Sequence, residues 1–133
     1  MQYPKLELIA EGKTKRLWST TDDKLVIAEY SDDAMLYHAK QKVYFAGKGH
    51  YCAEIDSLLM KQLYANNIPT HYVDRIEDNC LLVKKADMIP IEVVIRNYAA
   101  GSMCNRLGIE HGKKLKSPVL EFCYKNDKLN DPV

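Results

Sequence analysis

The stretch Ile91-Glu-Val-Val-Ile-Arg-Asn-Tyr-Ala-Ala-Gly-Ser102 predicts a strand that leads into a Gly-Ser turn. Successive side chains of a strand point to opposite sides, so Ile95 and Arg96 face different surfaces. A guanidinium is rarely buried without a partner, and Arg96 near the end of an apolar strand therefore indicates a cleft that holds an anion. The turn offers backbone N–H groups to a phosphate, and Ser102 is also a candidate N-cap. The alternative is a strand whose arginine pairs with a neighbouring acid.

Length and composition predict an ordinary globular protein. The chain has 133 residues, 47% of them hydrophobic, and a net charge of +1, which gives no reason to expect a nucleic-acid or membrane surface. Its four cysteines show neither CxxC nor zinc-like spacing and are typical of reduced thiols. No apolar run approaches the roughly 18 residues of a membrane span, and the start lacks the pattern of a signal peptide. A soluble protein of the cytoplasm is expected.

Periodicity and turn residues predict a mixture of strands and helices. The longer helix carries Ile55, Leu58, Leu59 and Leu63 on one face, and Asn66-Asn67 and Pro69 end it. The segment from Asp32 to Gly49 is polar and only weakly periodic. Besides the strand quoted above, the predicted strands are 6–10, 16–19, 24–30, 71–76, 80–86 and 119–124, and the predicted helices are 52–66 and 102–107.

Two other segments could carry chemistry. In Glu11-Gly-Lys-Thr-Lys15, Lys13 and Lys15 would lie on one face of an extended chain, about 7 Å apart. Gly12 would let the backbone approach nucleotide phosphates, although a Walker loop is absent and a solvated hairpin is the alternative. Lys125-Asn-Asp-Lys-Leu-Asn-Asp131 could hold Mg²⁺ through its acids and phosphate through its lysines; its alternative is a charged turn.

The ordered segments together resemble one known family, phosphoribosylaminoimidazole-succinocarboxamide synthase, also called SAICAR synthetase. The resemblance runs from about Leu6 to the last residue and corresponds to the N-terminal half of family members. It rests on Glu11–Lys15, Gly47-Lys-Gly49, Leu82–Pro90, Glu92–Ser102, Arg106-Leu-Gly-Ile109 and Lys125-Asn-Asp…Asp131-Pro.

The resemblance implies an ATP-dependent ligase of purine biosynthesis. Carboxyaminoimidazole ribonucleotide (CAIR), L-aspartate and ATP would give SAICAR, ADP and phosphate, with ATP and Mg²⁺ as cofactors. The expected partners are these small molecules, with no nucleic acid and no membrane, and a homo-oligomer is expected. Such phosphoryl chemistry needs positioning and cations more than acid–base groups.

Site residues follow from the same resemblance, position by position. The ATP site would comprise Gly12, Lys13, Thr14 and Lys15 over the phosphates, Leu17 and Ile27 in the adenine pocket, and Lys84, Ala86 and Met88 along a hinge edge that bonds the base. The substrate site would comprise Arg96, Gly101, Ser102, Lys125 and Asp131, with Asp131 as the metal ligand. Lys13, Arg96, Lys125 and Asp131 would serve catalysis.

The resemblance also implies a two-lobed α+β fold with an antiparallel, ATP-covering N-terminal lobe. Residues 1–88 would form that lobe, and 89–133 would begin a second, substrate-binding lobe that is incomplete. The chain departs from the family pattern at His38-Ala39 and Cys52-Ala53, where members carry Asn-Gly and Asn-Asn. Three functions stay open: the synthetase, a nucleotide-binding module without turnover, and a remnant that keeps only the fold.

Overall fold

The computed structural model describes residues 3–36, 41–126 and 132, and the chain divides into two compact units, 1–86 and 87–133. The predicted boundary lies two residues further along, between 88 and 89. His38 and Ala39, where the sequence departs from the family pattern, lie outside the described residues. Within 3–36 and 41–126, no helix combines the length and the apolar character that crossing a membrane requires.

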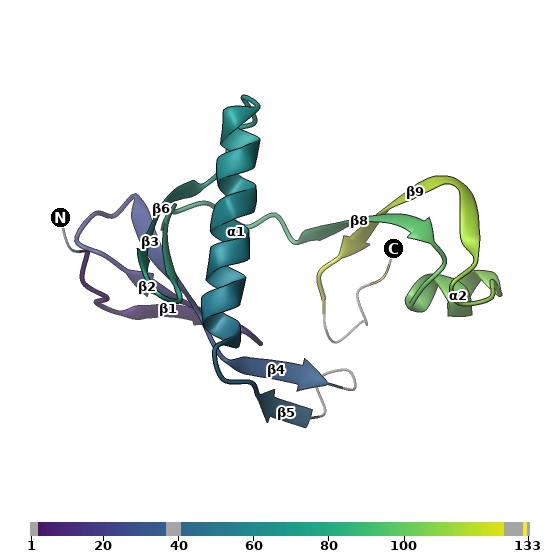
Figure 1. The fold of residues 1–133 in the computed structure, drawn as a ribbon, viewed down its shortest axis with the longest axis horizontal. Helices are drawn as coiled ribbons and strands as arrows, with labels where there is room; N and C mark the ends of the chain where they lie inside the picture. Colours follow the sequence, from purple (N-terminus) through teal and green to yellow (C-terminus); the bar gives the residue numbers. More distant parts are fainter. Residues whose placement is uncertain (1–2, 37–40, 127–131, 133) are drawn as a thin grey trace. The chain divides into compact units, whose positions relative to one another are not determined.

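Unit 1 consists of an antiparallel sheet, one long helix and a separate hairpin (Figure 1). The five-stranded sheet has the order β1-β2-β3-β7-β6, and β4 and β5 pair only with each other among the described residues. The elements are β1 (Leu8–Glu11), β2 (Lys15–Ser19), β3 (Leu25–Tyr30), β4 (Asp33–Leu36), β5 (Gln41–Tyr44), α1 (Lys48–Ala65), β6 (Tyr72–Glu77) and β7 (Cys80–Lys84).

Alternation along the central strand β3 gives the sheet two different buried faces. Val26, Ala28 and Tyr30 point to the face that α1 covers, where they pack with residues of β7 and with Ala53 of the helix. Ile27 points to the opposite face and is fully buried beside Cys80 and Leu82. Because β3 is buried on both sides, it reads as a nearly continuous apolar run in the sequence.

Helix α1 packs on the sheet through small residues. Gly49, Ala53 and Ser57 are its buried positions, and the Ser57 and Tyr72 hydroxyl oxygens lie 2.8 Å apart. The apolar face expected from the sequence, with Ile55, Leu58, Leu59 and Leu63, is exposed instead. Small side chains let the helix backbone approach the strands closely, and the four larger residues then project away from the sheet.

The N-terminus of α1 is held by a residue that lies sixteen positions upstream. Gly47, the N-cap, has no capping side chain of its own, but the Asp32 carboxylate accepts the N–H groups of Gly49 at 2.8 Å and Gly47 at 3.1 Å. It also accepts the Tyr44 hydroxyl of β5 at 3.0 Å. These bonds start the helix at Lys48, four residues before the predicted start at Cys52, and they join it to the unpredicted β4–β5 hairpin.

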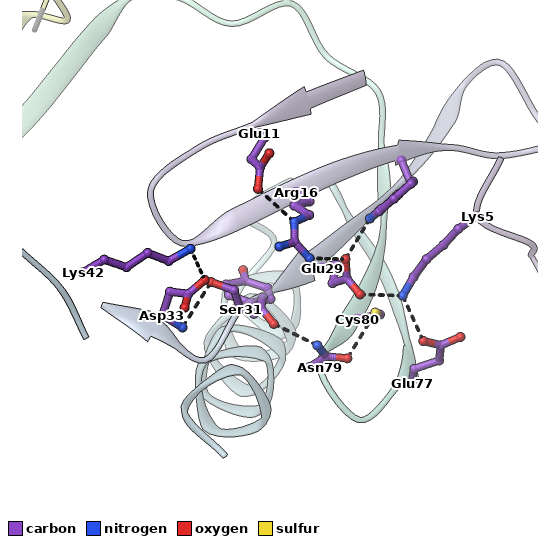
Figure 2. Close-up of polar contacts among 12 residues, drawn as sticks. Lys5, Glu11, Arg16, Glu29, Ser31, Asp33, Lys42, Glu77, Asn79 and Cys80 are labelled. Carbon is purple, nitrogen blue, oxygen red and sulfur yellow. Dashed lines mark hydrogen bonds and ion pairs between the residues drawn. The ribbon is translucent and has the colours of Figure 1, made fainter. Parts of the chain in front are cut away.

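The face of the sheet opposite α1 carries a network of ion pairs (Figure 2). Lys5 lies between Glu29, at 2.9 Å, and Glu77, at 3.3 Å. The indole of Trp18 donates to the other oxygen of Glu29 at 2.9 Å, and Arg16 pairs with Glu11 at 3.0 Å. Burial raises the pKa of Glu29, but the hydrogen bonds from Lys5 and Trp18 outweigh it, so the net shift is downward. Each of the five charged side chains named here is therefore in an ion pair.

Unit 2 is a two-stranded antiparallel ribbon with one short helix. It contains β8 (Ile91–Tyr98), α2 (Ser102–Leu107) and β9 (Lys114–Tyr124). Strand β9 begins five residues before the predicted start; Pro118 is compatible with it because, among the described residues, β9 pairs only with β8. One ribbon face is uncovered, with exposures of 47% to 67% for its six large apolar side chains: Ile91, Val93, Ile95, Leu120, Phe122 and Tyr124.

The turn before α2 corrects one expectation. Gly101, not Ser102, is the N-cap of α2, and Ser102 is the first helical residue. Gly101 has φ 58° and ψ −139°, a backbone conformation that is essentially confined to glycine. The chain therefore turns sharply at Gly101, and the Ser102 hydroxyl makes no capping bond.

Gly49→Ala should destabilise unit 1. A Cβ at Gly49 would lie 2.5 Å from the Tyr30 carbonyl oxygen, so the helix would have to move off the sheet, at about 1–3 kcal/mol. The free energy of unfolding from urea titration measures this. Gly12→Ala is the control, because the nearest atom to its Cβ, the Lys15 oxygen, is 3.7 Å away. Equal stability of the two variants would contradict the close approach of helix and strand.

Asp32→Asn should make the protein less sensitive to acid. The N–H groups of Gly49 and Gly47 hold the Asp32 pKa below its ordinary 3.8. A lowered folded-state pKa means that the carboxylate stabilises the fold above pH 3.8 and that this contribution fades as pH falls through the folded-state pKa. Urea midpoints between about pH 6 and pH 3 should therefore decline less in Asp32→Asn than in the wild type. Asp23→Asn, at an exposed position, should decline as the wild type does.

Candidate active site

The Gly-Lys-Thr-Lys segment forms the hairpin between β1 and β2. The Gly12 N–H donates to the Lys15 carbonyl at 2.8 Å and closes the turn, and Lys13 and Thr14 form its tip. The Ser31 N–H donates to the Thr14 carbonyl at 2.9 Å, which ties the tip to the end of β3. The Lys15 ammonium lies 5.0 Å from the Tyr30 ring centroid, on the side of the sheet that α1 covers.

Leu17 and Ile27, both expected to line an adenine pocket, lie on opposite faces of the sheet. Leu17 is the cross-strand partner of Ala28 and packs on the cluster beneath α1, whereas Ile27 is enclosed on the other face. A flat base cannot contact both side chains. The residues of β3 that share a face with Leu17 are Val26 and Ala28, so Leu17 and Ile27 cannot both line one pocket on a single face of the sheet.

The segment after β7 connects the two units. The Lys84 N–H donates to the His71 carbonyl oxygen at 2.7 Å, and the Lys85 N–H donates to the Lys24 carbonyl oxygen at 2.8 Å. Both donors are therefore used inside unit 1. Ala86 and Met88 follow as exposed residues, and Met88 already belongs to unit 2.

Arg96 is held by an acid, as the alternative interpretation of the strand had it. Its Nε donates to Oε2 of Glu121 on β9 at 2.7 Å, and Arg106 of α2 donates to the other oxygen of the same carboxylate. The Glu121 side chain is only 7% exposed, against 19% for Arg96 and 39% for Arg106. Hydrogen bonds from Arg96 and then Arg106 lower the pKa of Glu121 and keep it ionised.

Sequence reasoning assigned no role to Glu121 or Arg106, although a signal was available. Glu121 is the only acid in the apolar predicted strand 119–124, and a charged side chain in such a strand usually has a buried partner. Asp32, which holds the start of α1, had no comparable local signal, because its partners follow an intervening hairpin.

The remaining substrate-site residues are dispersed. Gly101 and Ser102 form the turn at the start of α2. The Lys125 ammonium, directly after β9, lies 3.3 Å from Glu92 on β8. Asp131 lies outside the described residues. Among the residues that the structure does describe, no three His, Cys, Asp or Glu side chains gather to hold a metal ion.

A pocket of about 270 Å³ lies at the junction of the sheet and the β4–β5 hairpin. Three carboxylates and a single guanidinium contribute to its lining, and a triphosphate would be repelled there. Its lining residues are Arg16, Glu29, Tyr30, Ser31, Asp32, Asp33, Tyr44 and Asn79.

Known proteins share this sequence over nearly its whole length. A family model described as SAICAR synthetase matches residues 8–133. The chain belongs to the SAICAR synthetase family. This confirms the resemblance found in the sequence, to a family of ligases in purine biosynthesis.

Two relatives illustrate the extent of the match. The phosphoribosylaminoimidazole-succinocarboxamide synthase of Thermoanaerobacter sp. (strain X514) is 50% identical over 129 residues, which cover 97% of this chain and 55% of the relative. That of Bacillus subtilis (strain 168) is 42% identical over 133 residues, which cover 100% of this chain and 55% of the relative. The chain therefore spans about half the length of these curated relatives.

Solved structures of the SAICAR synthetase family share the fold. The synthase of Ehrlichia chaffeensis matches with a TM-score of 0.89 and 42% identity, over 95% of this chain and 53% of that one. A SAICAR synthetase solved in complex with ADP matches with a TM-score of 0.86 and 40% identity over the same shares. The expected two-lobed α+β fold of this family, with antiparallel sheets, is confirmed.

Leu17→Val and Ile27→Val form a matched pair, because each removes one carbon. If adenine lies on the Leu17 face, Leu17→Val should weaken ATP binding about fourfold, from about 0.8 kcal/mol per buried CH₂. Ile27→Val should leave ATP affinity unchanged and lower the free energy of unfolding by about 0.5–1.5 kcal/mol. Calorimetric titration with ATP and urea denaturation measure the two effects. Equal weakening of ATP binding by both variants would contradict the assignment of faces.

Proposed function

We propose that this chain supplies the ATP-binding unit and part of the substrate site of a SAICAR synthetase, which joins L-aspartate to CAIR at the expense of ATP. The observation that carries the proposal is in unit 1. The Gly-Lys-Thr-Lys hairpin carries Lys15, whose ammonium lies on the same side of the sheet as the half-buried side chain of Leu17. A cationic turn beside an apolar surface suits a nucleoside triphosphate, which has a charged end and a flat apolar end.

In this proposal the hairpin binds the phosphates. Gly12 keeps the turn tight, and the Thr14 backbone is fixed by Ser31. Lys13 and Lys15 supply positive charge toward the β- and γ-phosphates as phosphoryl transfer develops. Adenine would lie against Leu17, which is half-buried, whereas Ile27, Val26 and Ala28 are buried in the core.

The polar edge of the base would meet the connection between the units. The Lys84 N–H is already used by His71, so the donor to the base would come from the backbone of Ala86 or Met88. Lys84 would contribute its carbonyl or its side chain. The proposed hinge therefore stays at 84–88, with the N–H donor at Ala86 or Met88 and the other contact at Lys84.

CAIR would bind to unit 2. Arg96 would contact its phosphate, and the turn at Gly101 and Ser102 would offer a backbone N–H and a hydroxyl to the same group. Lys125 and Asp131 would face the reacting end of the substrate. Support comes from the sharp turn at Gly101, which presents Ser102 at the exposed start of α2.

The proposed reaction has two steps. The CAIR carboxylate oxygen attacks the γ-phosphorus and ADP leaves, which forms an acyl phosphate. The aspartate amine then attacks the acyl carbon, and an amide bond forms as phosphate leaves and the nitrogen loses a proton. The chain's residues orient the reactants and stabilise charge. Mg²⁺ would arrive with ATP and offset its negative charge, and Asp131 is the proposed protein ligand.

A second candidate is a nucleotide-binding module without turnover. The cationic hairpin and the half-buried Leu17 that support ATP binding would serve such a module equally well. The uncovered apolar face of the β8–β9 ribbon supports association, and we propose a homo-oligomer. The four free cysteines support the cytoplasm as its compartment.

ADP release by the purified chain tests the proposed function. With Mg-ATP, we expect turnover only when CAIR and aspartate are both present, and omission of either should abolish it. If the chain binds ATP in calorimetry but releases no ADP with both substrates, the module is the correct reading. Absence of ATP binding would contradict both candidates.

A further inference from the structure

The ribbon of unit 2 contains one buried carboxylate that holds two guanidinium groups. Each oxygen of Glu121 receives one arginine, Arg96 from β8 and Arg106 from α2. Glu121 is 7% exposed, so it is nearly withdrawn from water, and both of its oxygens are bonded. A strand, the facing strand and the helix are thus joined through a single side chain.

The geometry leaves the outer end of Arg96 available to a ligand. The bond to Glu121 uses Nε, the inner nitrogen of the guanidinium. The structure places neither terminal nitrogen of Arg96 in a hydrogen bond with another described residue. A planar guanidinium held at Nε has its remaining N–H groups fixed in direction, which favours recognition of a tetrahedral anion.

The charges of the group are unequal. Two arginines meet one glutamate, so one positive charge is left uncompensated. If Glu121 paired with Arg96 alone, the pair would be neutral and would attract an anion weakly. Arg106 therefore adds a second positive charge, so that Glu121 does not neutralise the whole group.

We infer that Glu121 is a positioning residue for the substrate phosphate: it fixes the direction of Arg96, and Arg106 keeps the three-residue group cationic. The inference rests on the proposed role of Arg96 in binding CAIR. It assigns roles to two residues to which the sequence analysis gave none, and it makes the phosphate site a unit of three side chains.

Two substitutions separate positioning from simple electrostatics. Glu121→Gln removes a negative charge, so charge alone predicts tighter phosphate binding. Glutamine, however, has one acceptor oxygen where the carboxylate has two, so it cannot offer a separate oxygen to each arginine, and its NH₂ group would meet one guanidinium as a second donor. Arg106→Gln removes a positive charge and leaves Glu121 to neutralise Arg96. The proposal predicts weaker phosphate binding in both variants. Charge alone predicts weaker binding in Arg106→Gln but tighter binding in Glu121→Gln, so the result for Glu121→Gln separates the two explanations.

The experiment is calorimetric titration of the full chain with CAIR, with the CAIR nucleoside that lacks the phosphate, and with Mg-ATP. For both variants we expect CAIR affinity to fall about tenfold, in line with a hydrogen bond to a charged group, and affinity for the nucleoside and Mg-ATP to stay within twofold. Glu110→Gln removes one charge from an exposed position in unit 2 and serves as the matched control. It should bind all three ligands as the wild type does.

The possible failures are distinct. CAIR affinity that is unchanged or higher in Glu121→Gln would overturn the positioning role while leaving the proposed function standing. Equal loss of all three ligands, with a lower melting temperature, would make Glu121 purely structural and would also overturn it. A wild-type chain that binds CAIR no better than the nucleoside would overturn the proposed phosphate site itself, and the inference with it. Glu121→Asp keeps the negative charge but shortens the side chain, so charge alone predicts unchanged CAIR affinity and positioning predicts a loss; this variant decides the test if Glu121→Gln does not fold.

Discussion

The close approach of α1 to β3 is the constraint on which unit 1 depends. At Gly49 the helix backbone is so near the Tyr30 carbonyl that a Cβ would lie 2.5 Å from it. The Asp32 carboxylate, two residues after Tyr30, accepts the N–H groups of Gly47 and Gly49. Together these contacts explain the Gly-Lys-Gly sequence. Gly49 lets the helix backbone lie close to the Tyr30 carbonyl, and Gly47 has the left-handed φ of 80° at the start of the helix. The position of the helix in turn decides which of the two buried sheet faces packs against Ala53.

The strands of the sheet could be predicted because their information is local. Strands β1 to β3 and the strand 91–98 follow from alternation and turn residues, and β6 and β7 lie close to their predicted bounds, whereas the β4–β5 hairpin was not predicted. The start of α1 could not be predicted in the same way, because its capping group is supplied from sixteen residues upstream. The direction of the helix's apolar face was equally hidden, since Gly49, Ala53 and Ser57 pack through their smallness rather than through hydrophobicity.

For the candidate site, sequence motifs predicted where the segments lie along the chain, but not which face of the sheet each side chain occupies. The Gly-Lys-Thr-Lys hairpin is where the pattern placed it, but the residues beside Leu17 depend on cross-strand register, which pairs Leu17 with Ala28. Neighbouring residues of a strand face opposite sides of the sheet, and this register places Leu17 and Ile27 on different faces. Arg96 shows the opposite case: both interpretations of its strand remain useful, since the acid that pairs with it at Nε can also hold it ready for an anion.

The order of the strands in unit 1 has a consequence for biosynthesis. Every strand of the five-stranded sheet, and the helix that covers it, lies within residues 1–86. A domain whose pairing partners are all present can fold as soon as it leaves the ribosome, and N-terminal domains generally do so first. Unit 1 can therefore reach its native structure while the ribbon that carries Arg96 is still being translated.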